Sequence, residues 1–295
     1  MTLSRQFCLR IGDIGIHVNA YDPEMLFLLD GALIQFLADH RESDIKIRAE
    51  RRDLSGVKCG EQLFDSGTVW RAYRENGSYA FQFNSPATGP IPYKVAFFDS
   101  EFSSGKIYFH RAYFNRPLAF YPLEYPLDEL LIVNLLAEGK GVEVHACGVV
   151  DSNGNGHLFV GQSEAGKTTM ARLWESEPGI TVLSDDRIIL RKMENTIWMY
   201  GTPWHGEAML ASPTRVPLTT VYFLEKGQKN ELISQKPSGS ISRLFASSFP
   251  PFYNRDALNF TLTFLEGVVK NVPCYELKFT PDRSVVEFIK GERFT

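Results

Sequence analysis

The chain has 295 residues, of which 44% are hydrophobic and 22% are charged, as in an ordinary soluble globular protein. Its formal net charge of −4 and isoelectric point near 5.9 argue against a broad electrostatic surface for nucleic acid. No apolar run is long enough to span a bilayer or to form a signal peptide. We therefore expect a cytoplasmic protein with two domains that binds neither nucleic acid nor membranes, and homo-oligomerisation is left open.

The first part of the chain reads mainly as β-structure. Turn formers such as Gly12-Asp13 and Asn76-Gly77 separate segments in which β-branched, aromatic and polar residues roughly alternate. Residues 25–39 are an exception, because their apolar residues recur at helical spacing and predict a helix. No phosphate or metal motif occurs here, so we expect residues 1–116 to form a β-rich accessory domain that serves recognition. The predicted strands cover residues 7–18, 44–51, 69–74, 79–83, 93–98 and 106–109.

Three prolines, Pro117, Pro122 and Pro126, stiffen the chain and mark the predicted boundary, after which residues 117–295 form the second domain. Pro126 can occupy the first turn of a helix, and acidic residues follow it where a helix dipole favours them. This helix is apolar almost all round and is expected to end at the glycines after residue 138. A buried hairpin is predicted next, from residues 142–150 and 157–160 around an Asn-Gly turn.

The second strand of this hairpin leads directly into a glycine-rich loop. The loop fits the pattern G-x-x-x-x-G-K-[ST], in which the glycines let backbone N–H groups approach a phosphate closely. The lysine then reaches the outer phosphates, the hydroxyl can ligate magnesium, and the helix that follows directs its positive end toward the anion. We therefore predict an ATP- and Mg²⁺-binding loop. Its residues are Gly161, Gln162, Ser163, Glu164, Ala165, Gly166, Lys167, Thr168 and Thr169.

A loop of this kind needs a further carboxylate for the metal at the end of a nearby strand. Residues 180–183 read as a buried strand, and Asp185 and Asp186 follow at its end. Because neighbouring side chains of a strand point in opposite directions, the two aspartates are expected to do different jobs. One would hold magnesium and the other would accept a proton from an attacking hydroxyl. We favour Asp186 as the base.

Two further elements carry polar side chains. The stretch from residue 200 to Glu207 contains two glycines, a proline, an indole, an imidazole and a carboxylate, which predicts a shaped polar loop. Glu207 is a candidate second metal ligand, and Trp204 or His205 could contact nucleotide or substrate. His145 lies on the strand paired with the one entering the glycine-rich loop, and both an active-site role and a structural role stay open for it.

At these positions the sequence resembles the HPr kinase/phosphorylase family, whose nucleotide-binding domain is related in fold to phosphoenolpyruvate carboxykinase. The resemblance rests on His145, on the loop at residues 161–169 and on the aspartate pair, and it covers residues 127–207. It implies a mixed α/β (α+β) fold with a P-loop kinase domain and a β-rich N-terminal domain. In that family the loop binds ATP, the aspartates serve metal binding and general base catalysis, and a downstream glutamate binds the metal. Carried over, these roles fall on Lys167, Thr168, Asp185, Asp186 and Glu207.

The chain departs from the family in two places. The family's glutamate lies in a Leu-Glu-Ile-Arg-Gly-like stretch, whereas Glu207 follows Trp-His-Gly, and the first 120 residues do not resemble the family's usual N-terminal domain. These departures favour a divergent branch that acts on a peptide or protein.

We therefore predict an ATP-dependent kinase that transfers the γ-phosphoryl group to a serine-type hydroxyl. The alternatives are a bifunctional kinase/phosphorylase, a regulatory nucleotide-binding module that transfers no phosphate, and, more weakly, a carboxykinase. An arginine is expected to assist the transfer, and the sequence leaves four candidates, which are Arg187, Arg215, Arg243 and Arg255.

Overall fold

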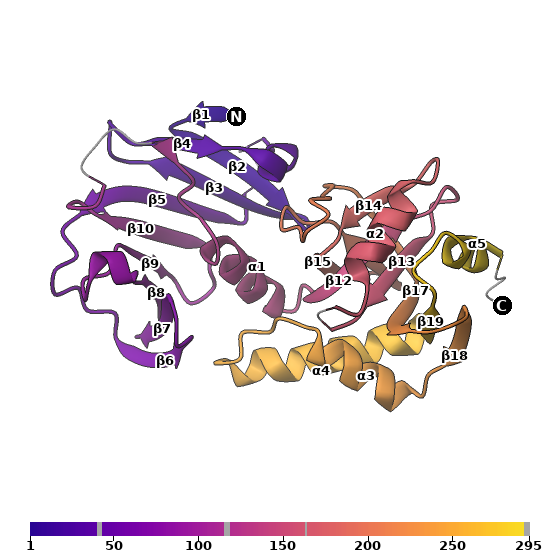
Figure 1. Ribbon diagram of the computed structural model, residues 1–295. Coiled ribbons are helices and arrows are strands. Elements are labelled where there is room, and N and C mark those ends of the chain that lie inside the picture. The colour runs from indigo at the N-terminus through magenta and orange to yellow at the C-terminus, as the bar shows by residue number, and fades with distance from the viewer. Residues whose placement is uncertain (40–42, 115–118, 163, 292–295) are drawn as a thin grey trace. The chain divides into compact units, whose positions relative to one another are not determined.

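The computed structural model describes residues 1–39, 43–114, 119–162 and 164–291. They form two compact units, Met1–Leu135 and Leu136–Thr295 (Figure 1). The division lies later in the chain than the predicted boundary between residues 116 and 117. The reason is that the short strand β11 (Ala119–Phe120) pairs in parallel with β4 (Leu26–Leu29), which ties the segment after the predicted boundary to the first unit. In the part of the chain that is described, no helix is long and apolar enough to cross a membrane.

The first unit is β-rich, as predicted. Its main sheet has eight strands in the order β2-β3-β5-β10-β9-β8-β7-β6, and a second sheet has the order β1-β4-β11. Most neighbours in the main sheet are antiparallel, but β5 runs parallel to both β3 and β10. The remaining bounds are β1 (Thr2–Ser4), β2 (Gln6–Ile11), β3 (Ile14–Ala20), β5 (Ile45–Arg52), β6 (Glu61–Asp65), β7 (Trp70–Glu75), β8 (Ser78–Phe83), β9 (Lys94–Phe98) and β10 (Ser104–His110), with 3₁₀ turns at η1 (Gly31–Phe36) and η2 (Pro86–Thr88).

The helix predicted over residues 25–39 is wrong. Its first part is the strand β4, which pairs with β1 as well as β11, and its second part is the 3₁₀ turn η1. Phe27 and Leu29 are fully buried while their neighbours are more exposed, which is the alternation of a strand. Gly31, the first residue of η1, takes a φ of +54°, in the left-handed region. The chain therefore changes direction where the strand ends. A short strand followed by a turn therefore reproduced the spacing of a helix.

The second unit is built around a sheet in the order β13-β12-β15-β16-β17-β19-β18, with β14 paired to β12. Because β13 also pairs with β17, five strands close into a ring, in the order β13, β12, β15, β16 and β17. The predicted helix at residues 126–138 and the predicted hairpin are both confirmed, as α1 and as β12 with β13. The helix α1 (Leu127–Ala137) spans the division between the two units. The other bounds are β12 (Val142–Val150), β13 (Gly156–Val160), α2 (Lys167–Glu175), β14 (Thr181–Ser184), β15 (Arg187–Met193), β16 (Thr196–Tyr200), β17 (Arg215–Lys226), β18 (Glu231–Ser234), α3 (Pro237–Ala246), α4 (Arg255–Asn271), β19 (Cys274–Phe279) and α5 (Ser284–Gly291).

Helices cover both faces of this sheet (Figure 1). Leu158 and Val160 of β13 pack in the core beneath α3 and α4, together with Leu244 and Leu265 of those helices. Phe159, which points the other way, packs with side chains of α2 and α5. Every residue of β13 is buried as a result, and this explains the uninterrupted apolar run that precedes the glycine-rich loop. The loop therefore begins from a strand that is held on both sides.

Two glycines of the second unit provide a matched test of this packing. A Cβ at Gly201 would lie 1.9 Å from the carbonyl oxygen of Ser212, whereas a Cβ at Gly267, in α4, would meet nothing within 4 Å. We expect Gly201→Ala to lower the free energy of unfolding by at least about 2 kcal/mol, because the chain segments must move apart. Gly267→Ala should raise it by about 0.5–1 kcal/mol, because alanine loses less backbone entropy in a helix.

The measurement is urea unfolding followed by tryptophan fluorescence, since three of the four tryptophans lie in the second unit. Equal unfolding midpoints for the two variants would contradict the close approach at Gly201.

Candidate functional site

The glycine-rich loop connects β13 to α2, so a strand precedes it and a helix follows it, as predicted. Gly166 caps the helix with a φ of +107°, and a Cβ there would lie 2.6 Å from the Phe279 ring. A Cβ at Gly161 would lie 2.6 Å from the Cβ of Ala165. The chain therefore needs glycine at both ends of the loop, for space at Gly161 and for space and conformation at Gly166. Ser163, a predicted phosphate-binding residue, lies outside the described residues.

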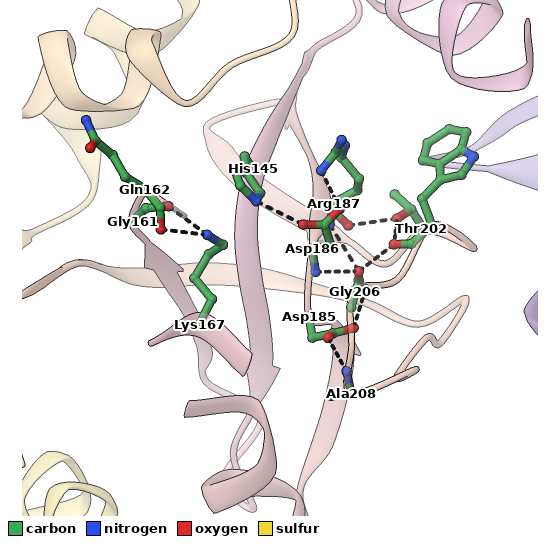
Figure 2. A network of polar contacts seen from close by, with 12 residues as sticks. His145, Gly161, Gln162, Lys167, Asp185, Asp186, Arg187, Thr202, Gly206 and Ala208 are labelled. Atoms are coloured by element: carbon green, nitrogen blue, oxygen red, sulfur yellow. Dashed lines mark hydrogen bonds and ion pairs between the residues drawn. The ribbon is translucent and has the colours of Figure 1, made fainter. Parts of the chain in front are cut away.

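Lys167 is the first residue of α2, and its side chain turns back over the loop (Figure 2). Its ammonium donates hydrogen bonds to the carbonyl oxygens of Gly161, at 2.8 Å, and Gln162, at 3.1 Å. The residue is only 7% exposed, and burial lowers the pKa of its ammonium while the charge of Asp186 opposes that shift. Both hydrogen-bond partners are neutral. A phosphate oxygen would therefore gain a charge-assisted hydrogen bond in a setting with little competing water.

The two aspartates lie at a bend between β14 and β15, which both pair antiparallel with β12. The backbone of Ala146 on β12 continues the pairing at the bend, where its N–H donates to the carbonyl oxygen of Asp186. The two side chains leave this bend toward different partners, in keeping with the expectation that they do different jobs (Figure 2).

Asp185 is buried, with 1% of its surface exposed, and it anchors the loop that follows β16. Its two carboxylate oxygens accept hydrogen bonds from the N–H groups of Gly206 and Ala208, both at 2.8 Å. A Cβ at position 206 would lie 2.8 Å from one of these oxygens, so glycine is needed there for the approach. The neighbouring Ser184 hydroxyl donates to the carbonyl oxygen of Trp204 at 2.8 Å. Asp185 was predicted as a metal ligand. In the structure its carboxylate accepts hydrogen bonds from the backbone of this loop.

Asp186 belongs to a different network, on the side of β12 that carries His145. Its Oδ1 lies 2.9 Å from His145 Nε2, and the Arg187 guanidinium donates a short hydrogen bond to its Oδ2. Burial alone would raise the pKa of Asp186, but the hydrogen bond to His145 and the charges of Arg187, His145 and Lys167 outweigh it and lower the pKa. Because its pKa is lowered, this carboxylate is ionised at neutral pH. Its side chain is 27% exposed and therefore reaches solvent.

Two contacts hold the Arg187 guanidinium in place, one with a carboxylate and one with an aromatic ring. Its Nε lies 3.5 Å from an oxygen of Glu143, whose side chain is fully buried. Its guanidinium lies 4.2 Å from the centroid of the Phe249 ring. The ion pair and the aromatic contact restrict the guanidinium to one orientation, and this orientation presents it to Asp186.

The structure thus brings together Lys167, His145, Asp186 and Arg187. Lys167 and Asp186 interact strongly enough for each to shift the other's pKa. Glu207 is exposed, and its side chain forms no hydrogen bond or ion pair with any described residue. The hydroxyl-bearing residues Thr168 and Thr169 are half-buried in the first turn of α2. In the loop at residues 200–207, His205 Nδ1 lies 3.2 Å from the carbonyl oxygen of Gly206.

Within the described residues, no group of three or more His, Cys, Asp or Glu side chains could hold a metal ion by itself. Magnesium in nucleotide sites commonly uses one or two carboxylates together with the phosphates and water, so it does not need such a group. The Thr168 hydroxyl, at the start of α2, is the oxygen donor of the loop that suits it here. The residues present therefore fit magnesium only when it arrives with a nucleotide.

A cavity of about 550 Å³ lies beside the loop, and it is lined by loop residues, the end of β17 and α3. Arg243 of α3 reaches into its wall and is held by ion pairs of 2.9 Å to Glu225 and Glu276. Of the other candidate arginines, Arg215 packs over the Trp198 ring at 5.2 Å, and Arg255 begins α4 on the surface. The sequence alone gave no reason to prefer one of these four arginines as the residue that assists transfer, because no sequence motif marks α3 or the segments next to it.

No family model matches the chain, and no curated protein matches it either. Among solved structures the chain is similar to the HPr(Ser) kinase/phosphatase from Coxiella burnetii, with 12% sequence identity and a TM-score of 0.29. The match covers 50% of this chain and 93% of that one. A likeness this slight indicates no function, which must therefore be argued from the residues of this chain.

If Asp185 anchors the loop, its substitution lowers the free energy of unfolding even when no nucleotide is present. Asp185→Asn places an amide NH₂ opposite one of two backbone N–H groups, and we expect it to lower the free energy of unfolding by about 1–3 kcal/mol. Glu207→Gln is the same chemical change on the exposed part of the same loop, and it should alter stability by less than about 0.5 kcal/mol. Urea unfolding of both variants without nucleotide makes the comparison. A loss of stability in the Glu207 variant alone would contradict the assignment.

Proposed function

We propose that this chain is an ATP- and Mg²⁺-dependent kinase of the HPr-kinase-like type, which transfers the γ-phosphoryl group to a serine-type hydroxyl of a peptide or protein. The observation that carries the proposal is the buried Lys167 ammonium. It sits on a glycine-rich loop between a buried strand and a helix N-terminus, and its hydrogen-bond partners are carbonyl oxygens of that loop. A site of this construction has positive charge and backbone N–H groups available for an anion.

The residues of the loop would bind and orient the phosphates. Lys167 would exchange its bonds to the loop carbonyls for the β- and γ-phosphate oxygens, and the N–H groups at the start of α2 would face the same anion. Thr168 would direct its hydroxyl to the metal. Magnesium bound with ATP supplies additional positive charge at the transferring group.

Asp186 would orient the hydroxyl that receives the phosphoryl group. Its pKa is lowered, so it is ionised at neutral pH and can accept a hydrogen bond from an incoming hydroxyl. His145 and Arg187 fix the carboxylate from two sides and limit its motion. Phosphoryl transfer depends mostly on such positioning and on charge stabilisation, and a carboxylate in this place accepts the proton as the new bond forms. We assign Asp185 to the support of this arrangement through the loop at Gly206.

The choice of a peptide or protein acceptor is supported by the motif resemblance. His145, the glycine-rich loop and the aspartate pair follow the pattern of HPr kinases/phosphorylases, which act on a serine of a protein. The loop with Glu207 differs from that pattern, which favours an acceptor other than HPr. A phosphorylase reaction would use the same residues with inorganic phosphate as the acceptor.

The nucleotide-binding part of the proposal predicts ligand stabilisation. ATP with Mg²⁺ should raise the melting temperature, because a ligand at about a thousand times its dissociation constant stabilises a protein by about 4 kcal/mol. Lys167→Ala should abolish most of this rise. Lys192→Ala, a change at an exposed lysine of β15 in the same unit, should leave it intact. Differential scanning fluorimetry with ATP, with and without EDTA, measures these effects, and an unchanged melting curve in the wild type would refute nucleotide binding.

The transfer step predicts a different pattern for Asp186→Asn. This variant should bind ATP at nearly wild-type affinity but transfer phosphate about 10²–10⁴-fold more slowly, the usual effect of removing a positioned acid–base group. The assay uses γ-labelled ATP with a cell extract or with peptides encoded by neighbouring genes. If the wild type binds ATP but transfers phosphate to no acceptor, not even water, a regulatory nucleotide-binding module would replace the kinase.

A further inference from the structure

At β5 the main sheet of the first unit has one face in the core and one face toward solvent. In β5, Ile45, Ile47 and Ala49 are buried, whereas Lys46 and Arg48 between them are exposed. Lys106 lies directly opposite Arg48 on the adjacent strand β10. These residues therefore share the outer face near the middle of an eight-stranded sheet, where β5 and β10 lie side by side (Figure 1).

Two adjoining hollows, of about 720 Å³ and about 530 Å³, lie on this outer face. They share Phe97 and Lys106 in their linings, so they form one continuous surface. Five basic and two acidic side chains line them together, although the whole chain has more acidic than basic residues. We call this surface the basic face, and it comprises Lys46, Arg48, Arg52, Lys58, Phe97, Lys106 and Tyr108.

The charges of the basic face are largely unsatisfied within the chain. The side chains of Lys46, Arg48, Lys58 and Lys106 form no hydrogen bond or ion pair with any described residue. Like charges directly opposite each other on neighbouring strands, such as Arg48 and Lys106, destabilise a sheet. This repulsion is a cost to the stability of the sheet. An anionic partner would remove that cost.

Aromatic side chains add an apolar element to the same surface. Phe97 and Tyr108 meet edge to face, with ring centroids 5.9 Å apart. The guanidinium of Arg52 lies 5.3 Å from the centroid of the Tyr108 ring. A partner that fits here therefore carries negative charge together with some apolar surface.

We infer that the basic face binds an acidic segment of a peptide or protein. Three carboxylates interrupt the surface, since Asp53 and Asp99 line the hollows and Glu50 lies opposite Tyr108. A nucleic acid strand carries a charge at every nucleotide and would be repelled at these points. A peptide can place acidic residues opposite the cations and uncharged or apolar residues opposite the carboxylates and rings. That this segment belongs to the phosphoryl acceptor rests on the proposed function, whereas the binding itself does not.

Fluorescence anisotropy tests the inference with a labelled peptide in which glutamate alternates with serine around a central phenylalanine. The controls are the same peptide with lysine in place of glutamate, and labelled oligothymidylate. We expect the wild-type chain to bind the acidic peptide, more weakly as salt is raised. The double variant Arg48→Glu/Lys106→Glu should weaken this binding more than about tenfold, because it reverses two charges at the centre of the surface. Lys192→Glu/Lys229→Glu makes the same change on exposed strand and loop positions of the second unit and should have less than about a twofold effect.

Urea unfolding establishes that the variants are folded, and Arg48→Gln/Lys106→Gln replaces the charge reversal if that variant is not. Failure of the wild type to bind the acidic peptide, equal weakening by both double variants, or tighter binding of oligothymidylate would each overturn the inference. Because no step of the assay uses ATP, a chain that binds the peptide but transfers no phosphate refutes only the kinase. A chain that transfers phosphate but does not bind the peptide refutes only the basic face.

Discussion

The burial of the Lys167 ammonium is the constraint on which the second unit depends. A cation with 7% of its surface exposed must have oxygen partners, and the loop supplies them by folding two carbonyl groups toward it. That folding is only available because Gly161 and Gly166 let the chain pass against Ala165 and the Phe279 ring. The loop in turn keeps its shape because β13 is fixed on both faces and α2 packs on one of them. Sheet, glycines and helix therefore act together to hold one charge in place.

The two aspartates show how one bend in a strand can serve two purposes. The carboxylate of Asp185 turns inward and accepts hydrogen bonds from two backbone N–H groups. It thereby fixes the path of the loop at Gly206 and Ala208. The carboxylate of Asp186 turns to the opposite side and meets His145 and Arg187. An ordinary strand would bury one of these side chains and expose the other without a link between them. Here the bend places the exposed carboxylate within electrostatic reach of Lys167, and the buried one holds the loop beneath it.

The sequence predicted the elements that have strong local signals. The hairpin of β12 and β13 was found because a buried strand pair around an Asn-Gly turn leaves an unmistakable pattern, and the helix α1 because its ends carry proline and glycine. The glycine-rich loop was located by its motif, although only the steric reason for Gly161 is local, since the Cβ of Ala165 lies beside it and Gly166 lies against the distant Phe279 ring. The strand β4 was mistaken for a helix because its pairing with β1 and β11 depends on residues far away in the chain.

Contacts between distant segments also explain what the sequence could not say about the site. Nothing in the neighbourhood of Glu143 or Phe249 indicates that both support Arg187, because residues from β12, β15 and the segment after α3 meet only in the folded chain. The role of Asp185 was missed for the same reason, since its partners lie more than twenty residues downstream. The two glutamate partners of Arg243 and its place in the cavity wall likewise come from segments far apart in the chain, so the sequence alone could not show them.

The cations of the two units are arranged differently, and under the proposed function this difference would affect how an acceptor is selected. In the second unit the cations around the loop are few, buried or held by carboxylates, so they suit a compact anion in one fixed position. In the first unit the cations of the basic face are exposed and spread along two strands, so they suit an extended anion whose exact register is less restricted. Exposed charges contribute mainly to encounter and to selection among partners, whereas buried ones contribute to orientation. Under the proposed function, the first unit would therefore select the acceptor by its acidic segment, and the second unit would orient the phosphates.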